Sequence, residues 1–336
     1  MAVKTFDLAT FEEQVRSAYV DVIGEKLGGK VVGVSDEFFA EASNLIKPKP
    51  AVRELGRFTY NGAWYDGWET RRHNPEPADW VVFKFGVASA QIIGCEVDTA
   101  HFNGNQAPAA SVECAYVEAG EPDASTVWDE VLEKTECGPS CRQFFVRAAS
   151  LTDKSYNFAR LKMFPDGGIA RFRLYGRPKV VLPTDRSTVL DLASVFNGGL
   201  AIAQSDQHFG TTDNLLLPGR GVDMGDGWET TRSRLPGHED WVEVQLGARA
   251  VVQKIVVDTA FFRGNFPDRV RVEGIDKTGA GSWRVLVPEQ KAKADFEHEY
   301  TAADVLQNTA EPVTHVRLVM IPDGGCKRLR VFGTVA

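Results

Sequence analysis

The sequence has few cysteines, no long hydrophobic run and no basic run, and each absence excludes a class of protein. Five cysteines in 336 residues are too few, and odd in number, for a disulfide framework, so we expect a reducing, cytoplasmic location. No stretch reaches the ~18 apolar residues of a membrane-spanning helix, and the N-terminal MAVKTFDLATFEEQ has charges where a signal peptide needs an apolar core. A net charge of −8 without lysine or arginine runs argues against nucleic acid or an anionic membrane as partner.

What the sequence does contain is a long internal repeat. The phrase DGWET at residues 66–70 recurs at residues 226–230, at an offset close to half the chain. Five further pairs of blocks keep the same order: DLA at 7–9 and 191–193, the segments from Gly28 and Gly198, ADWVVFKFG and EDWVEVQLG, EVDTAHFNGN and VVDTAFFRGN, and MFPDGGIARFRLYG and MIPDGGCKRLRVFG. This order predicts a duplicated domain, with repeats at 1–176 and 189–336 and a linker at 177–188.

The first copy carries two segments that the second copy lacks. Residues 10–27 predict an amphipathic helix, because Thr10 and Glu13 form a capping box and Gly28 can end the helix. The second segment lies in KPKPAVRELGRFTYNGAWY, residues 47–65, a proline-rich stretch before Asp66. Outside these segments the repeats consist of short runs rich in β-branched and aromatic residues between Gly, Asn and Asp turns. The sequence therefore predicts a mainly β protein of two sandwich domains with few short helices.

The order of turns and strands resembles the galactose-binding-like jelly roll, in both repeats. The longer motifs DGWETRR, DTAHFNGN and PDGGIARFRLYG resemble one family more closely, the allantoicases, whose chains comprise two such jelly rolls. This resemblance covers most of both halves. The first copy departs from the family pattern where NPEPADW replaces a motif like the PGHEDW of the second copy. That departure leaves open which half carries the chemistry.

The DGWET phrase and its basic tail form the first candidate site. Asp66 and Gly67 predict a turn, and Trp68 is expected to pack at the entrance of the sandwich. In an extended chain, alternate side chains share a face, so Glu69, Arg71 and His73 would point one way. A solvated edge strand is the alternative to a site. Arginine follows the phrase in both copies, as Arg71 and Arg72 in the first and Arg232 in the second.

The DTAHFNGN motif is the second candidate site. His101, Asn103 and Asn105 follow a predicted strand in a loop, where sandwich folds often build their sites. The second copy keeps Asn265 but has Phe261 in place of His101, so the two halves differ in chemistry. His101 is therefore the residue that we most expect to be catalytic.

The resemblance implies hydrolysis of allantoate to ureidoglycolate and urea. Arg72 or Arg71 would bind the substrate carboxylate, Glu69 would activate water or anchor a ureido group, and His101 would give a proton to the departing urea. The catalytic pair is thus His101 and Glu69. The predicted substrate-binding residues are Arg71, Arg72, His73, Asn103, Asn105, Glu229, Arg232 and Asn265.

Other interpretations remain open from the sequence. No cofactor is predicted, although Asp66, Glu69, His73 and His101 together would suit a divalent ion such as Mn²⁺. Tandem domains of this class also occur as carbohydrate-binding modules without catalysis. A third possibility is that one repeat is catalytic and the other a scaffold. By analogy with the family we expect a homo-oligomer.

Overall fold

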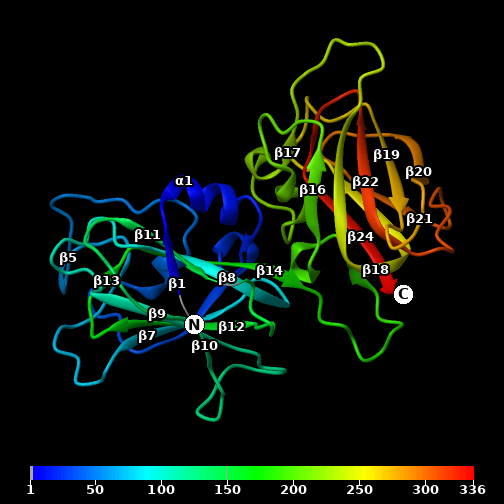
Figure 1. Cartoon of the computed structure of the whole chain (residues 1–336). Helices are drawn as coiled ribbons and strands as arrows, with labels where there is room; N and C mark the ends of the chain where they lie inside the picture. Colours follow the sequence, from blue (N-terminus) through cyan, green and yellow to red (C-terminus); the bar gives the residue numbers. More distant parts are fainter. Residues whose placement is uncertain (1–2, 149) are drawn as a thin grey trace. The chain divides into compact units, whose positions relative to one another are not determined.

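Alternating apolar and polar residues build two five-stranded antiparallel sheets in the first repeat (Figure 1). The computed structural model describes residues 3–148 and 150–336. One sheet has the order β1 (Val3–Phe6), β11 (Arg142–Arg147), β8 (Ser89–Asp98), β14 (Arg171–Lys179) and β2 (Val20–Asp21). The other has the order β10 (Asp129–Glu136), β9 (Ala109–Ala115), β12 (Phe158–Phe164), β7 (Asp79–Lys84) and β3 (Lys30–Val34). Phe83 and Phe172 pack between them with ring centroids 5.6 Å apart.

The second repeat has the same layers, but one long strand belongs to both. Strand β18 (Asp240–Asp258) pairs over its first part with β16 (Leu200–Gln204) and β22 (Val313–Ile321). Over its second part it pairs with β21 (Glu297–Thr301) and β24 (Arg328–Val335). The remaining strands are β15 (Leu190–Asp191), β19 (Arg269–Ile275) and β20 (Arg284–Lys291). The predicted fold class, two tandem β-sandwiches, is confirmed.

Short elements complete each repeat. The first repeat has the pairs β4 (Phe58–Thr59) with β5 (Gly62–Ala63) and β6 (Trp68–Glu69) with β13 (Gly168–Ile169), and the second has β17 (Trp228–Glu229) with β23 (Gly325–Cys326). Single 3-10 turns span Glu25–Leu27, Ala42–Ile46, Val195–Asn197, Thr212–Leu216 and Met224–Asp226. The chain divides into compact units at residues 1–179 and 180–336. Strand β14 thus includes residues 177–179, where the sequence predicts the start of a linker.

The predicted helix over residues 10–27 is wrong. Helix α1 covers only Leu8–Phe11, and its N-cap is Asp7, whose carboxylate accepts from the Thr10 N–H at 2.8 Å. A π-helical turn, Glu12–Arg16, follows, and β2 then pairs with β14 at Tyr175 and Gly176. The backbone of β2 gains sheet partners that a helix would deny it, and this tertiary pairing outweighs local helix propensity. Gly28 does end the segment, in the left-handed conformation at φ 91°.

In each repeat, the glycines of the DGW and DGG motifs pack closely against the ring of a buried phenylalanine. A Cβ atom on Gly168 would lie 2.2 Å from the Phe102 ring, and one on Gly67 would lie 2.8 Å from it. Gly325 and Gly227 enclose Phe262 in the same way. Glycine is therefore required at both places by close approach, and the repetition of these phrases is explained by packing.

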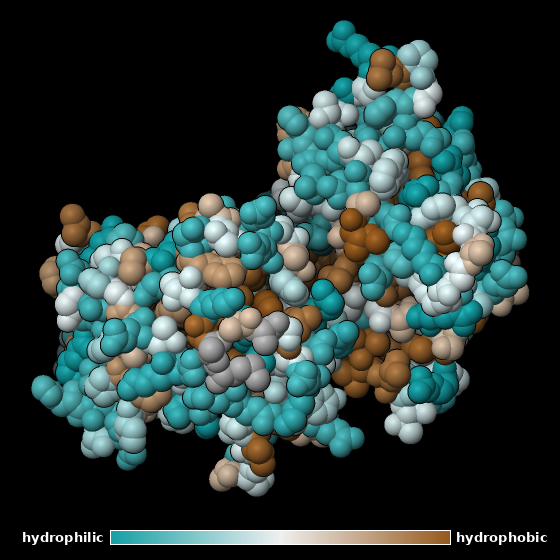
Figure 2. Space-filling model, viewed as in Figure 1, coloured by the Kyte–Doolittle hydropathy of each residue, from teal (hydrophilic) through white to brown (hydrophobic). Residues whose placement is uncertain are grey.

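The tryptophan of DGWET is fully buried in both repeats. The indole N–H of Trp68 donates to the backbone carbonyl of Asp36 at 2.7 Å, and Trp228 donates to Asp206 at 2.8 Å. On the face shown in Figure 2, hydrophilic residues cover most of the surface and hydrophobic ones form smaller patches. Within the described residues, no helix combines the length and apolar character needed to span a bilayer.

Candidate functional site

The carboxylate of Glu69 lies at the end of the two-stranded pair β6–β13, opposite Gly168. It is 7% exposed, and one of its oxygens accepts from the amide of Asn105 at 2.9 Å. Burial raises the pKa of Glu69, while the Asn105 hydrogen bond and the charges of Arg72 and Arg53 lower it to a smaller extent. The structure therefore brings together two of the predicted residues, and the carboxylate so held can act as an acid or a base.

Arg72 is the third predicted residue that joins this group. Its guanidinium donates to Asp166 at 2.9 Å and to the backbone carbonyl of Asn105 at 2.8 Å. Asp166 also accepts from the backbone N–H of Asn74 at 3.2 Å. Burial opposes ionisation of Asp166, but these bonds prevail and lower its pKa. Arg72 is thus fixed in place while it keeps further N–H groups to offer an anion.

The extended conformation that would place Glu69, Arg71 and His73 on one face does not continue to His73. The Arg71 N–H donates to Asp36 at 2.7 Å, and the Arg71 guanidinium donates to the same carboxylate at 2.8 Å. His73 is exposed and adopts a left-handed φ of 64°. The backbone bends at Arg72 and His73, so the alternation of an extended chain ends there.

Arg71, Arg72 and His73 instead line a groove of about 700 Å³. Its wall also includes Asp36, Glu76, Trp80 and Lys162. Neither Glu69 nor Asn105 lines this groove. Arg72 alone among the predicted residues both lines the groove and contacts the Glu69–Asn105 pair.

His101 is exposed on the loop after β8, at a left-handed φ of 70°. Its Nε2 lies 3.2 Å from the backbone carbonyl of Ala51. A carbonyl only accepts, so Nε2 carries a proton in this contact and Nδ1 is left to accept or, in the imidazolium, to donate. Asn103 lies exposed in the same loop.

The four side chains considered for a divalent ion do not form one ligand set. Asp66 is buried against Arg171, with 2.6 Å between carboxylate and guanidinium. Across residues 3–148 and 150–336, no group of three or more His, Cys, Asp or Glu side chains is placed to hold a metal ion.

Sequence reasoning missed Arg53, Asp36 and Asp166. Asp166 lies in the PDGG motif, which was interpreted as a turn because of its glycines, so no role was assigned to the aspartate. Arg53 lies in the proline-rich segment 47–65, which has no full counterpart in the second repeat to mark it. The segment is held where Val52 N–H donates to Asp66 at 3.0 Å. The one feature of the sequence that could have pointed to Arg53 is its place in an insertion that directly precedes a candidate site.

The second repeat keeps the same polar arrangement. Asn265 donates to Glu229 at 2.5 Å, and Arg232 contacts Asp323 at 3.4 Å and the Gly264 carbonyl at 3.0 Å. The side-chain pairs match those of Glu69 with Asn105 and of Arg72 with Asp166, while the carbonyl bound by Arg232 is one residue earlier in the loop. The predicted residues of the second repeat are thus brought together as well.

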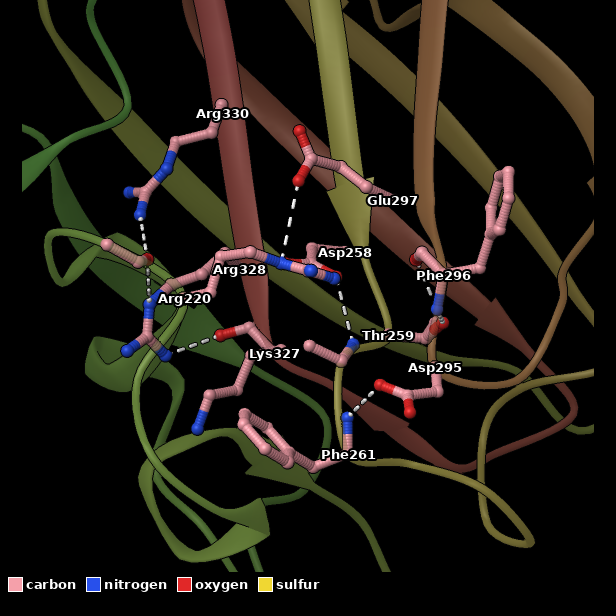
Figure 3. Close-up of polar contacts among 12 residues, drawn as sticks. Arg220, Asp258, Thr259, Phe261, Asp295, Phe296, Glu297, Lys327, Arg328 and Arg330 are labelled. Carbon is pink, nitrogen blue, oxygen red and sulfur yellow. Dashed lines mark hydrogen bonds and ion pairs between the residues drawn. The ribbon is translucent and has the colours of Figure 1, made fainter.

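The surroundings of this second arrangement differ. Phe261 has the position and the left-handed φ, 68°, of His101. The Lys327 ammonium lies 5.1 Å from the centre of the Phe261 ring, and Arg220 pairs with Asp258 at 2.8 Å and with Glu297 at 3.5 Å (Figure 3). The second repeat therefore offers no imidazole where the first has one.

Comparison with known proteins identifies the relatives of this chain. The family model described as the allantoicase repeat matches residues 20–179 and 190–336. Allantoicase from Saccharomyces cerevisiae is 54% identical over 328 residues, which cover 94% of this chain and 93% of that protein. Allantoicase from Neurospora crassa is 50% identical over 335 residues, covering 96% and 93%. The crystal structure of the S. cerevisiae allantoicase aligns with a TM-score of 0.79 at 52% identity, covering 99% of this chain and 100% of that one.

Proposed function

The chain belongs to the allantoicase family of hydrolases, which act on linear amidines, and we propose that it hydrolyses allantoate to ureidoglycolate and urea around Glu69 of the first repeat. The observation that carries this location is the buried Glu69 carboxylate, bonded to Asn105 and bordered by the fixed guanidinium of Arg72. The first repeat also has a histidine, His101, where the second repeat has Phe261.

The substrate is small and carries one carboxylate and two ureido groups on one carbon. In this proposal Arg72 binds the carboxylate, since Asp166 and the Asn105 carbonyl already orient its guanidinium. The remaining donor and acceptor of the Asn105 amide are suited to a ureido group. The groove that contains Arg71 and His73 also contains Arg72, and it gives the substrate access to this guanidinium.

Glu69 and His101 divide the proton transfers. The Glu69 carboxylate accepts a proton from the attacking water, and a raised pKa makes it a better base than an ordinary carboxylate. The imidazolium of His101 donates from Nδ1 to the nitrogen of the departing urea, while Nε2–H stays on the Ala51 carbonyl. A bond forms between the water oxygen and the substrate carbon, and the bond from that carbon to the urea nitrogen breaks. Glu69 gains the proton that water loses, and urea gains the proton that His101 loses. Either order of cleavage and water addition uses the same groups.

The test is release of urea from allantoate by the purified protein, with and without prior EDTA treatment. Urea release is expected, and retained activity after EDTA is expected of a reaction that these side chains carry alone. Activity lost with EDTA and restored by Mn²⁺ would add a metal to the site. No release from protein shown folded by circular dichroism would contradict the proposal and favour a carbohydrate-binding module.

The location is tested with Glu69→Gln and Glu229→Gln assayed separately. Loss of a general base lowers turnover by ~10²–10⁴-fold, so Glu69→Gln is expected to lose at least this much. Equal losses in the two variants would contradict a site confined to the first repeat. Assembly into a homo-oligomer also remains a prediction, which light scattering on the same preparations will check.

A further inference from the structure

We propose that Arg53, carried by the segment 47–65, binds the substrate carboxylate together with Arg72, so that the first repeat has two arginines for its anionic substrate. This inference rests on the proposed function. Arg53 would then be a specificity-determining residue, and it lies in a segment of the first repeat that has no full counterpart in the second.

An aromatic stack holds Arg53 toward Glu69. The guanidinium lies 4.2 Å from the centre of the Tyr65 ring and also donates to the backbone carbonyl of Trp64. Tyr65 in turn stacks on Phe102 at 4.8 Å, and Phe102 fills the space against Gly168, the strand partner of Glu69. Cation–π contact with tyrosine restricts the arginine without using all of its N–H donors.

The backbone before Arg53 is tied to the same site. The Ala51 carbonyl contacts His101, and the Val52 N–H donates to Asp66 in the turn that precedes Glu69. The tip of the segment, by contrast, is exposed: Leu55 is 89% exposed. Arg53 therefore stands at the anchored base of the segment and not on its free tip.

Charge explains why two arginines are useful here. Arg53 and Arg72 both act electrostatically on Glu69 and lower its pKa against the larger effect of burial. An allantoate carboxylate bound beside Glu69 brings a second negative charge into the site. Asp166, the partner of Arg72, is a third carboxylate. With Arg72 alone two negative charges would be uncompensated, and Arg53 reduces this excess to one.

The second repeat has no such arrangement. Tyr65 has Gly225 as its counterpart in the alignment of the two DGWET phrases, so the aromatic shelf is missing. The arginine of the shorter loop, Arg220, is bonded to Asp258 and Glu297 (Figure 3). The arginine held on an aromatic ring before the DGWET phrase is therefore a property of the first repeat.

The experiment compares Arg53→Met and Arg53→Lys with the matched control Arg57→Met. Arg57 lies in the same segment, stacks on Trp64 at 4.1 Å and pairs with Glu54. Arg53→Met should raise KM for allantoate roughly 10- to 100-fold, the range for loss of hydrogen bonds to a charged group. It should also move the acidic limb of the kcat/KM–pH profile to higher pH, because Glu69 loses a neighbouring positive charge. Arg53→Lys should restore the limb and part of the KM, and Arg57→Met should change neither.

The outcomes separate this inference from the proposed function. If the wild-type protein releases no urea, the proposed function fails. If it does, an Arg53→Met protein with wild-type KM and an unmoved acidic limb overturns the role of Arg53. Should Arg53→Met not fold, Arg53→Lys decides: a raised KM with an unmoved limb supports the inference, and a wild-type KM overturns it.

Discussion

The substitution Gly168→Ala tests how close packing around Phe102 contributes to the stability of the first repeat and to its activity. The added Cβ would lie 2.2 Å from two atoms of the Phe102 ring, which is 1% exposed and stacked on Tyr65. The ring has to move by roughly 1 Å to restore van der Waals contact. Such overpacking costs ~1–3 kcal/mol, or roughly 2–12 °C in the Tm of a domain of this size. Because Gly168 pairs with Glu69, a displacement of ~1 Å should also lower kcat/KM by up to ~10²-fold.

The matched variant is Gly325→Ala, whose Cβ would lie 2.0 Å from the Phe262 ring in the second repeat. It should lose similar stability in thermal unfolding followed by circular dichroism, yet lose less activity at temperatures where it is folded. Gly264→Ala, with nothing within 4 Å of the new Cβ, is the neutral control. A Gly168→Ala protein with the wild-type Tm would refute the packing argument. Equal losses of activity in the two overpacked proteins would refute a site in the first repeat.

Three further variants test the roles assigned to individual side chains. His101→Asn should lower kcat ~10²–10⁴-fold in the urea assay, and a folded variant with unchanged turnover would remove His101 from the mechanism. Asp166→Asn should raise KM roughly 10-fold or more with a smaller effect on kcat, because Arg72 loses the carboxylate that orients it; steady-state kinetics with an unchanged KM would contradict this. Asn105→Ala removes a hydrogen bond that lowers the pKa of Glu69, so the acidic limb of kcat/KM should move to higher pH, and a limb that stays in place or moves to lower pH would show that Glu69 is not the base.

Repetition made most of the fold predictable. Most blocks that occur twice form the same strands, tight turns and 3-10 turns in both repeats, so the class and the number of domains followed from the sequence. The DLA pair is an exception, because residues 7–9 begin helix α1 whereas Asp191 ends strand β15. The helix predicted over residues 10–27 was wrong because this segment has no second copy for comparison and because its conformation is determined by residues far away in the sequence. Val20 and Asp21 receive their backbone hydrogen bonds from Tyr175 and Gly176, which no local pattern reveals.

The site was predictable to the same extent. Glu69, Asn105 and Arg72 have counterparts in the second copy, and the structure groups both sets. The face assigned to His73 failed because this residue adopts a left-handed φ at a bend, where the alternation of an extended chain ends. Arg53 has no counterpart in the second repeat, so comparison of the two copies could not identify it as a site residue.

The two loops that precede the DGWET phrases leave the sandwich from equivalent anchors. Arg171 donates to the Lys49 carbonyl at 2.8 Å and to the Asp66 carbonyl at 2.9 Å. Arg328 binds the carbonyls of Gly219 and Asp226 in the same way, at 3.1 and 2.6 Å. Loops that begin and end on the same anchors are exchangeable parts, whatever their length. A graft of residues 50–65 in place of 220–225 would thus carry an arginine and its aromatic support into the second half without altering either sheet. Gene duplication left this chain with a second scaffold on which a new specificity can be built by loop replacement alone.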